Sequence, residues 1–555
     1  MLRWLVLLCI PFLAFLLNAG EHWPFIRSGP FEVYSATGDR PARETMNQLE
    51  QFRHALAVTL GKDDLHLIWP VRILIFKNGK QGAGIPPVFA FGRDSYVTAG
   101  VEDHLADLAR LLIDQNTSRV PPFIEQGLID VFSTLQVNGT HITIGAPPAK
   151  RTRDWARMHL LLCNPDFAGR SRVMISNLEQ GSDLAVAYRN AYQKSAAEIE
   201  KLVDAEMASG SPGTNTISAL ALDPKRDFDV LSADAADVGL IKADLLLAAN
   251  SPDAEAAYNA LHGPGASEGL GLVALKAAHK DEARRLFASA IESDSKSARV
   301  YLEAATLETD AAKARKNLAK AIELNPLWAV PPYDLAMRET DLDRKAALLK
   351  KATSLHPRNI GYWEALAKNE TEASRFVEAQ KAWGGAEKAA TTEEERAQIR
   401  KTRLDLEAER AAHEAAEHKR LADEAAADLQ RVKNASYAAI HQAEDAARKK
   451  LNPDGAPPPK ATEWWSGQDA GAKVEGTLQK LDCMGSLGRL IIETSDGKVV
   501  HILVGDPAKI TVAGGGNTTL ACGPQKDPRK VLVLYNPKID KKMGTAGEAV
   551  SIEFH

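Results

Sequence analysis

A short phrase that recurs at equal steps constrains this chain more than any other feature of its sequence. Residues 290–294 read Ala-Ile-Glu-Ser-Asp, residues 321–326 read Ala-Ile-Glu-Leu-Asn-Pro, and residues 352–357 read Ala-Thr-Ser-Leu-His-Pro, so both steps are 31 residues. Equal steps of this size indicate stacked units of supersecondary structure. Each unit is predicted to hold two antiparallel helices. The second helix should end before the proline, because proline removes a hydrogen-bond donor and disfavours helix in the preceding residue.

The segments between the phrases carry aromatic and small side chains suited to packing between helices. Together with the period, they resemble the tetratricopeptide repeat, whose usual period is slightly longer, at about 34 residues. We therefore predict a tetratricopeptide-like array over residues 230–390. The resemblance implies that the inner face of the array binds an extended protein or peptide, with candidate contacts at Tyr301, Tyr333, Arg338 and Trp363. The alternative for the aromatic residues is packing between helices.

The length of the chain limits the number of its domains, and its charge limits the classes of partner. At 555 residues it exceeds what one hydrophobic core serves, so three or four domains are expected. A net charge of −5 and a pI near 6.3 give no case for nucleic acid or an anionic membrane surface as a partner. The glycine-rich residues 514–517 lack the Lys-Ser/Thr of a phosphate-binding loop, and we expect no cofactor.

The N-terminus has the pattern of a signal peptide. Arg3 supplies a positive start, residues 4–17 are apolar, and residues 18–20 are small enough for cleavage. A retained membrane anchor is the alternative, but the apolar run is shorter than the roughly 20 residues that span a bilayer. We therefore assign residues 1–19 to a signal peptide. The protein is expected to be exported, either periplasmic or secreted, and to meet a membrane only during export.

The cysteines fit an exported protein. Cys9 lies in the signal segment, whereas Cys483 and Cys522 lie together in the C-terminal part of the chain. In an oxidising compartment these two are expected to form a disulfide. Cys163 follows an apolar helical pattern and is predicted to be a buried free thiol.

Residues 30–210 are predicted to form an α/β domain. Two apolar runs have the composition of strands, and three segments have apolar residues at helical spacing. The strands are expected at residues 31–35 and 70–76, and the helices at residues 40–60, 102–114 and 123–136.

The last of these helices carries a phrase that resembles a zinc peptidase motif. Residues 123–127 read Phe-Ile-Glu-Gln-Gly. They are similar to the phrase that follows the His-Glu-x-x-His helix in the thermolysin-like peptidases called peptidase MA-like, or gluzincins. In that family the glutamate of this phrase is the third zinc ligand, a position that falls on Glu125.

The first half of the motif is degenerate. The slot of His-Glu-x-x-His is occupied by residues 106–110, with Ala106 and Arg110 in place of the histidines and Asp107 in place of the catalytic glutamate. A catalytic zinc site needs three protein ligands, and alanine and arginine supply none. We therefore predict a peptidase-like fold without metal, in which Arg110 and Glu125 form an ion pair. The alternative is a zinc peptidase with a divergent site that uses Glu125.

The rest of the chain is predicted to form a long helix and a small β domain. Residues 392–451 are rich in Ala, Glu, Arg and Lys, and neither glycine nor proline interrupts them. A proline-rich linker follows at residues 452–473. Residues 474–555 alternate with the period of strands and have turn signals between them, which indicates a β-barrel or sandwich.

These features predict a multidomain protein: an α/β domain, an all-α array with a long helix, and an all-β module. The favoured function is a non-catalytic exported scaffold for a protein or peptide partner. Two other hypotheses are a zinc metallopeptidase and a glycan-binding protein acting through the β module.

Overall fold

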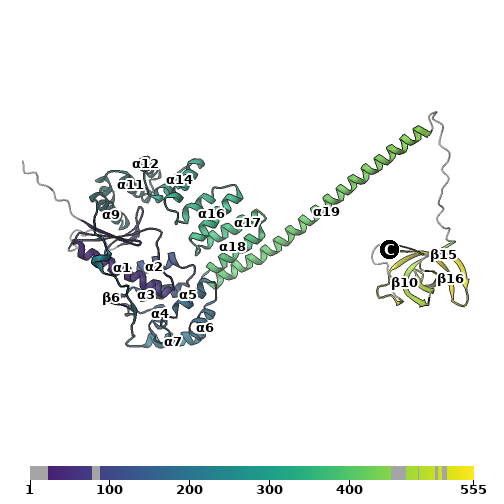
Figure 1. Cartoon of the computed structure of the whole chain (residues 1–555), viewed down its shortest axis with the longest axis horizontal. Coiled ribbons are helices and arrows are strands. Elements are labelled where there is room, and N and C mark those ends of the chain that lie inside the picture. The colour runs from purple at the N-terminus through teal and green to yellow at the C-terminus, as the bar shows by residue number, and fades with distance from the viewer. Residues whose placement is uncertain (1–22, 78–87, 452–470, 486, 507–509, 515–521) are drawn as a thin grey trace, which may run out of the picture. The chain divides into compact units, whose positions relative to one another are not determined.

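The computed structural model describes residues 23–77, 88–451, 471–485, 487–506, 510–514 and 522–555 (Figure 1). The predicted signal peptide and most of the predicted linker lie outside these residues. The chain divides into two units, residues 1–424 and 425–555, which are described separately. Among the described helices, none is both long enough and apolar enough to cross a membrane.

The N-terminal domain is built on a mixed sheet in the order β4-β5-β3-β2-β1-β9. Strands β2, β3 and β5 are parallel, and antiparallel strands lie at both edges. Helix α1 (Asp39–Leu60) buries Met46, Leu49, Phe52 and Leu56 against this sheet. The strands are β1 (Pro24–Ser28), β2 (Phe31–Ser35), β3 (Val71–Ile75), β4 (Phe89–Phe91), β5 (Tyr96–Ala99) and β9 (Leu231–Ser232).

A group of helices completes this domain below the sheet. Gly127 lets the helices α3 and α4 cross closely, because a Cβ atom there would lie 2.6 Å from Cγ of Met158. The helices are α2 (Leu105–Asn116), α3 (Pro122–Phe132), α4 (Arg153–Cys163), α5 (Ser171–Glu179), α6 (Leu184–Tyr192), α7 (Ala196–Ala208) and the short α8 (Pro224–Asp227). A second, three-stranded sheet contains β6 (Gln136–Asn138), β7 (His141–Ile144) and β8 (Asn215–Ser218).

The array consists of successive helices that pack in antiparallel pairs, which confirms the predicted helical repeat. Helices α14 and α16 end at Leu324 and Leu355, one residue before the Asn and His that precede proline. Their N-caps, Asp310 and Asp341, are also 31 residues apart, and both accept hydrogen bonds from the first-turn backbone. The helices are α9 (Ala235–Ala248), α10 (Ala254–Asn259), α11 (Pro264–Lys276), α12 (Lys280–Glu292), α13 (Ala298–Leu307), α14 (Ala311–Leu324), α15 (Val330–Ala336), α16 (Leu342–Leu355), α17 (Ile360–Glu372) and α18 (Phe376–Ala389).

The loops at the ends of the repeats dock against the N-terminal domain. Trp69 of that domain packs edge-on against Trp328, with ring centroids 5.1 Å apart. Asn325, in the recurring phrase, donates a hydrogen bond to the carbonyl oxygen of Ile68 at 3.1 Å. Ser297, which follows the first copy of the phrase, donates to the carbonyl oxygen of Arg93 at 3.2 Å. The recurring phrase and the residues that follow it therefore contribute to the contact between the array and the sheet domain.

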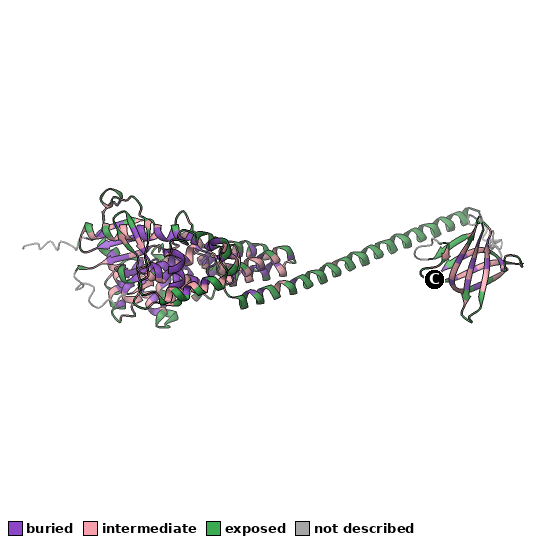
Figure 2. Cartoon of the chain, turned by 90° about the horizontal axis from the view of Figure 1, so that it is seen from below, coloured by how far each residue is buried: buried purple, intermediate pink, exposed green. Residues whose placement is uncertain are grey.

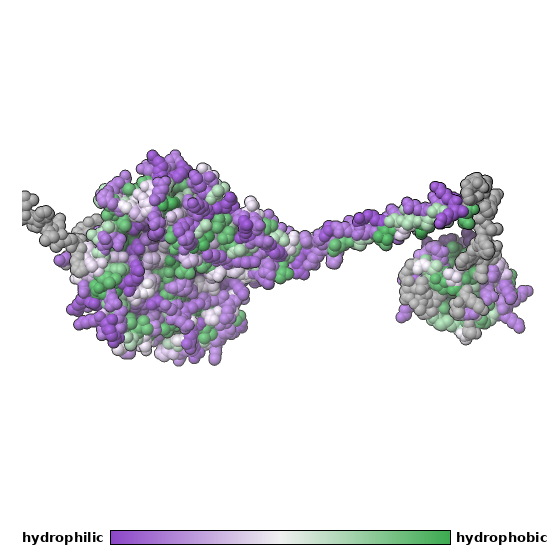
Figure 3. Space-filling view, turned by 45° about the horizontal axis from the view of Figure 1, so that its top comes forward, coloured by the Kyte–Doolittle hydropathy of each residue, from purple (hydrophilic) through white to green (hydrophobic). Residues whose placement is uncertain are grey.

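The long helix α19 (Glu393–Leu451) begins against the last repeat and continues in solvent. Ile399 and Leu406 are buried with residues of α18. From residue 407 to residue 451 every residue except Glu417 is exposed (Figure 2). Leu429 and Val432 are among the exposed apolar residues of this part. Figure 3 shows hydrophobic residues beside hydrophilic ones along the helix.

The C-terminal domain is a five-stranded barrel. Its strands close in the order β10-β11-β12-β16-β15-β10, with β12 and β16 parallel and the other four pairs antiparallel. This order, with one parallel pair, is that of the Greek-key barrel called the OB fold. The predicted disulfide joins Cys483 and Cys522, whose Cα atoms are 5.7 Å apart. The strands are β10 (Ala472–Met484), β11 (Leu487–Thr494), β12 (Val499–Val504), β15 (Lys530–Asp540) and β16 (Thr545–Phe554), with the short β13 (Thr511–Gly514) and β14 (Gly523–Pro524) beside them.

Candidate functional site

The positions that correspond to the zinc motif lie on α2 and α3, which pack against each other. Ala106 is half-buried against the core of the domain. Asp107 accepts a hydrogen bond from Nδ1 of His104 at 3.0 Å when that nitrogen carries the proton. Arg110 donates from Nη2 to Oε1 of Gln126 at 3.2 Å.

The predicted ion pair between Arg110 and Glu125 is wrong. Glu125 is instead paired with Arg358, and Arg358 also contacts Asp114 at 3.0 Å. Arg358 belongs to the loop between α16 and α17. The docking of the array places this loop beside the N-terminal turn of α3, where Glu125 lies. Local spacing on α2 and α3 could not reveal this partner, because it lies 233 residues further along the chain.

The residues at these positions do not fit a zinc ion. Ala106 has no ligand atom, Arg110 keeps a positive charge, and the carboxylate of Glu125 is occupied by Arg358. Within the described parts of the chain, no group of three or more His, Cys, Asp or Glu side chains is placed to hold a metal ion. Cys163 is a free buried thiol there, and burial raises its pKa to about 12.

The degenerate positions open onto a cleft between the N-terminal domain and the array. The cleft has a volume of about 1050 Å³, and Arg110, Glu125 and Arg358 line it together with the partly buried ring of Phe123. Arg157 lies over that ring, 4.9 Å from its centroid. The lining of the cleft therefore combines apolar groups with the ion pair of Glu125 and Arg358 and with Arg110, which donates to Gln126.

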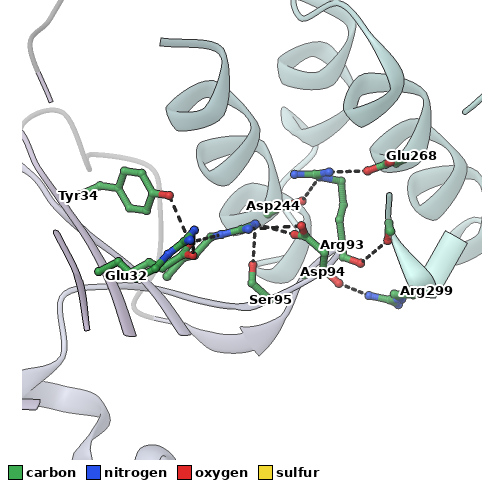
Figure 4. A network of polar contacts seen from close by, with 12 residues as sticks. Glu32, Tyr34, Arg93, Asp94, Ser95, Asp244, Glu268 and Arg299 are labelled. Carbon is green, nitrogen blue, oxygen red and sulfur yellow. Dashed lines mark hydrogen bonds and ion pairs between the residues drawn. The ribbon is translucent and has the colours of Figure 1, made fainter. Parts of the chain in front are cut away.

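A second polar cluster holds the sheet to the first helices of the array (Figure 4). Arg93, from the turn between β4 and β5, contacts Asp244 of α9 at 3.1 Å and Glu268 of α11 at 2.5 Å. Tyr258 donates a further hydrogen bond to Asp244 at 2.5 Å. Burial raises the pKa of Asp244, although the charge of Arg93 opposes this effect.

The sheet side of this cluster continues through Arg72, which contacts Glu32 at 2.8 Å and Asp94 at 2.6 Å. Burial alone would raise the pKa of Asp94, but the charges of Arg72 and Arg93 lower it. We call the whole set the junction network. The sequence offered no signal for it, because its arginines and carboxylates look like ordinary surface charges until the domains are docked.

The predicted contacts on the array have different surroundings. Tyr301 is buried beside Trp69 at the docking surface. Tyr333 lies against Tyr362, with ring centroids 4.6 Å apart, and Arg338 donates to the carbonyl oxygen of Asp334 at 3.2 Å. None of these three residues is among those that line the groove over Trp363.

Trp363 forms the floor of a groove over α18. Its Nε1 donates to the carbonyl oxygen of Pro357 at 2.9 Å, which fixes the indole. Gly385 is required beneath the ring, because a Cβ atom there would lie 2.5 Å from it. Gly384, the preceding residue, has no such neighbour within 4 Å of its Cβ position.

The groove over Trp363 has a volume of about 790 Å³ and adjoins a second hollow of about 560 Å³. The two share Gly384, Lys388 and Arg403 in their linings. We call them together the α18 groove. It lies where the last repeat, the start of α19 and the α5–α6 region of the N-terminal domain meet.

Comparison with known proteins gives structural likenesses only. No family model matches the sequence, and no curated protein matches it. The MamA protein is 18% identical over 28% of this chain and 91% of its own, with a TM-score of 0.25. A MamA fragment from Desulfovibrio magneticus RS-1 is 15% identical over 28% of this chain and 94% of its own, with a TM-score of 0.24. YrrB, described as a TPR protein with an unusual peptide-binding site, is 18% identical over 30% of this chain and 92% of its own, with a TM-score of 0.26. Likenesses this limited carry no conclusion about function.

Proposed function

We propose that this protein is a non-catalytic, exported scaffold that binds a protein partner through the α18 groove. The observation that carries the proposal is the pair of glycines in the middle of α18. Each glycine destabilises a helix interior by about 0.5–1 kcal/mol relative to alanine. The ring of Trp363 explains Gly385, but no neighbouring atom explains Gly384. Its missing side chain instead keeps the groove open above an aromatic floor.

The non-catalytic part of the proposal rests on the residues at the zinc-motif positions. Two of the three ligand positions hold Ala106 and Arg110, and the third holds a carboxylate paired with Arg358. The exported part rests on the signal-peptide pattern of residues 1–19 and on the disulfide of the barrel, since disulfides persist in oxidising compartments.

Filling the groove at Gly384 tests partner binding without damaging the fold. Gly384→Leu places a side chain into open space on a helix, so it should raise helix stability and block the groove. Gly384→Ala is the matched control, which adds only a Cβ atom. A displayed peptide library should yield sequences that bind the natural protein and the alanine variant but not the leucine variant. If no selected peptide distinguishes the leucine variant, the groove is not the partner site.

The zinc content of the mature protein tests the non-catalytic assignment. The protein purified from zinc-supplemented medium should retain no stoichiometric zinc, and Glu125→Ala should leave that result unchanged. One zinc ion per chain that disappears in Glu125→Ala would instead establish a divergent metal site and make peptide hydrolysis the next assay.

A further inference from the structure

The geometry points to the kind of partner that the α18 groove takes: an extended, acidic peptide segment that carries an apolar anchor side chain. This inference rests on the proposed binding role of the groove and adds its chemistry. Two observations support it independently, namely the charge of the groove's rim and the apolar character of its floor.

The rim has more positive than negative groups. Five cations line the two hollows, against the three carboxylates of Glu179, Asp183 and Glu387. Glu179 is already paired with Lys62, a residue from outside the lining, at 2.8 Å. An excess of positive charge in a low-dielectric hollow attracts a negatively charged ligand and raises its association rate.

The cations on the rim differ in how far they are paired. Lys381 pairs with Glu378 at 2.8 Å, and Arg396 pairs with Asp183 and with Glu393. Arg400 and Arg403 share a single carboxylate, that of Glu387. Lys388 is exposed and forms no ion pair with any described residue. Arg396 is 4% exposed and pairs through Nη1, while its buried Nε and Nη2 have no hydrogen-bond acceptor among the described residues. An exposed cation such as Lys388 can donate to a carboxylate of a ligand, and charged hydrogen bonds of this kind are shorter and stronger than neutral ones.

The floor is apolar and rigid. The indole of Trp363 is held by its hydrogen bond to the backbone, and Pro357 lies beside it. Val377, on the wall of the groove, is 56% exposed. A fixed aromatic floor with an exposed aliphatic wall suits one large apolar side chain, which would anchor the peptide while its carboxylates meet the rim.

The test uses the full chain and three fluorescent peptides of equal length, each with one central leucine. One peptide is rich in Glu and Asp, one is neutral and one is rich in Lys. Fluorescence anisotropy at low salt should show at least tenfold tighter binding of the acidic peptide, and the difference should shrink as salt is raised. Gly384→Leu should abolish binding of all three.

Charge reversal on the rim provides the specific variant. Lys388 is exposed and has no ion-pair partner in the described parts of the chain. Lys388→Glu should lower the affinity for the acidic peptide at least fivefold and raise the affinity for the basic one. Arg420→Glu is the matched control on α19, since among the described residues Arg420 pairs with its helix neighbours Glu417 and Glu424 alone. Its affinities should match those of the natural chain.

The outcomes separate this inference from the proposed function. In one outcome, the natural chain binds all three peptides equally and Gly384→Leu still abolishes binding. That result would overturn the acidic preference and leave the groove as a binding site. Binding that ignores Gly384→Leu would overturn both proposals. A single-stranded oligonucleotide that binds as tightly as the acidic peptide, and with the same dependence on Lys388, would show that the rim recognises polyanions rather than peptides.

Discussion

At the scale of single residues, the side chains that decide the structure are the buried charges between domains. Arg93 reaches two carboxylates on different array helices, and Arg358 takes the carboxylate that a peptidase would use for zinc. Removing one partner from a buried pair typically costs about 3–5 kcal/mol, because it leaves a charge without compensation. The junction network is therefore a strong constraint on how the two domains sit.

Asp244 should make the stability of this junction depend on pH. Its pKa is raised in the folded state, chiefly by burial. A carboxyl group of this kind favours folding at low pH, and that contribution is lost as pH rises through the raised pKa. Asp244→Asn cannot titrate, but its side-chain oxygen can still accept from Arg93 and Tyr258. We expect its free energy of unfolding to fall less, as pH rises above 3.8, than that of the natural chain.

Urea unfolding of the full chain across a pH series would measure this effect. Asp281→Asn is the control, since that carboxylate is 91% exposed and its one ion pair in the described part of the chain is with Arg284, three residues along its helix. Identical pH slopes in the natural chain and in Asp244→Asn would contradict the prediction.

At the scale of elements, α19 combines a packed start with a solvated remainder. Its charged pairs at i and i+4 support the helix by only a few tenths of a kcal/mol each. Ile399 and Leu406 in its first turns meet Phe376 and Trp383 of α18, and the ring of His413 further along lies 5.2 Å from that of Phe376. The same helix therefore carries leucines in two environments, Leu406 buried against α18 and Leu429 exposed to solvent.

Leu406→Ala and Leu429→Ala should differ although they lie on the same helix. Leu406 is 6% exposed and Leu429 is 55% exposed. Truncating a buried leucine costs about 2–5 kcal/mol, whereas an exposed substitution usually stays within about 0.5 kcal/mol. Amide hydrogen exchange of α18 should speed up in the first variant only. Equal protection in both variants would mean that the start of α19 does not stabilise the last repeat.

The barrel should depend on its disulfide. Cys483 and Cys522 are 39 residues apart, and closing a loop of that size stabilises a fold by about 4 kcal/mol on the chain-entropy model. In the full chain with both cysteines replaced by alanine, β10 and β16 should exchange their amide protons faster, while α1 should be unaffected. Unchanged exchange in β10 would contradict this role.

At the scale of the whole molecule, the N-terminal domain and the array act as one unit. The array contributes Trp328, Asn325 and Arg358 to a surface that the N-terminal domain completes. An arrangement of this kind differs from a free solenoid, whose repeats contact only their neighbours. The barrel forms its own unit with a separate core.

Separating the array from the N-terminal domain should therefore destabilise it. Residues 233–424 expressed alone would expose Trp328 and Tyr301 and leave Asp244 without Arg93. We expect broadened unfolding and aggregation, both reversed when residues 23–232 are added in trans. Residues 1–424, which keep the two together, serve as the control and should unfold like the full chain. A well-folded isolated array would show that the docking surface is dispensable.

Local sequence patterns were enough to predict the features that depend on residues close together in the chain. The phrase that recurs every 31 residues located the repeat and the ends of α14 and α16, because proline acts on the residues beside it. Apolar periodicity located α1, and alternation with turn signals indicated the β domain. These patterns report local geometry: helix spacing, caps and strand alternation each involve residues a few positions apart.

The ion-pair partners of the charged residues became visible only in the folded chain. Glu125 pairs with Arg358 and not with the predicted Arg110. Arg93 pairs with Asp244, which is 151 residues further along the chain, and with Glu268, which is 175 residues further along. The fold also places Gly384, which has no distinctive sequence context, in the lining of the groove over Trp363. Such pairings follow from how domains pack, and a charged or glycine residue carries no mark of its distant neighbours until the chain has folded.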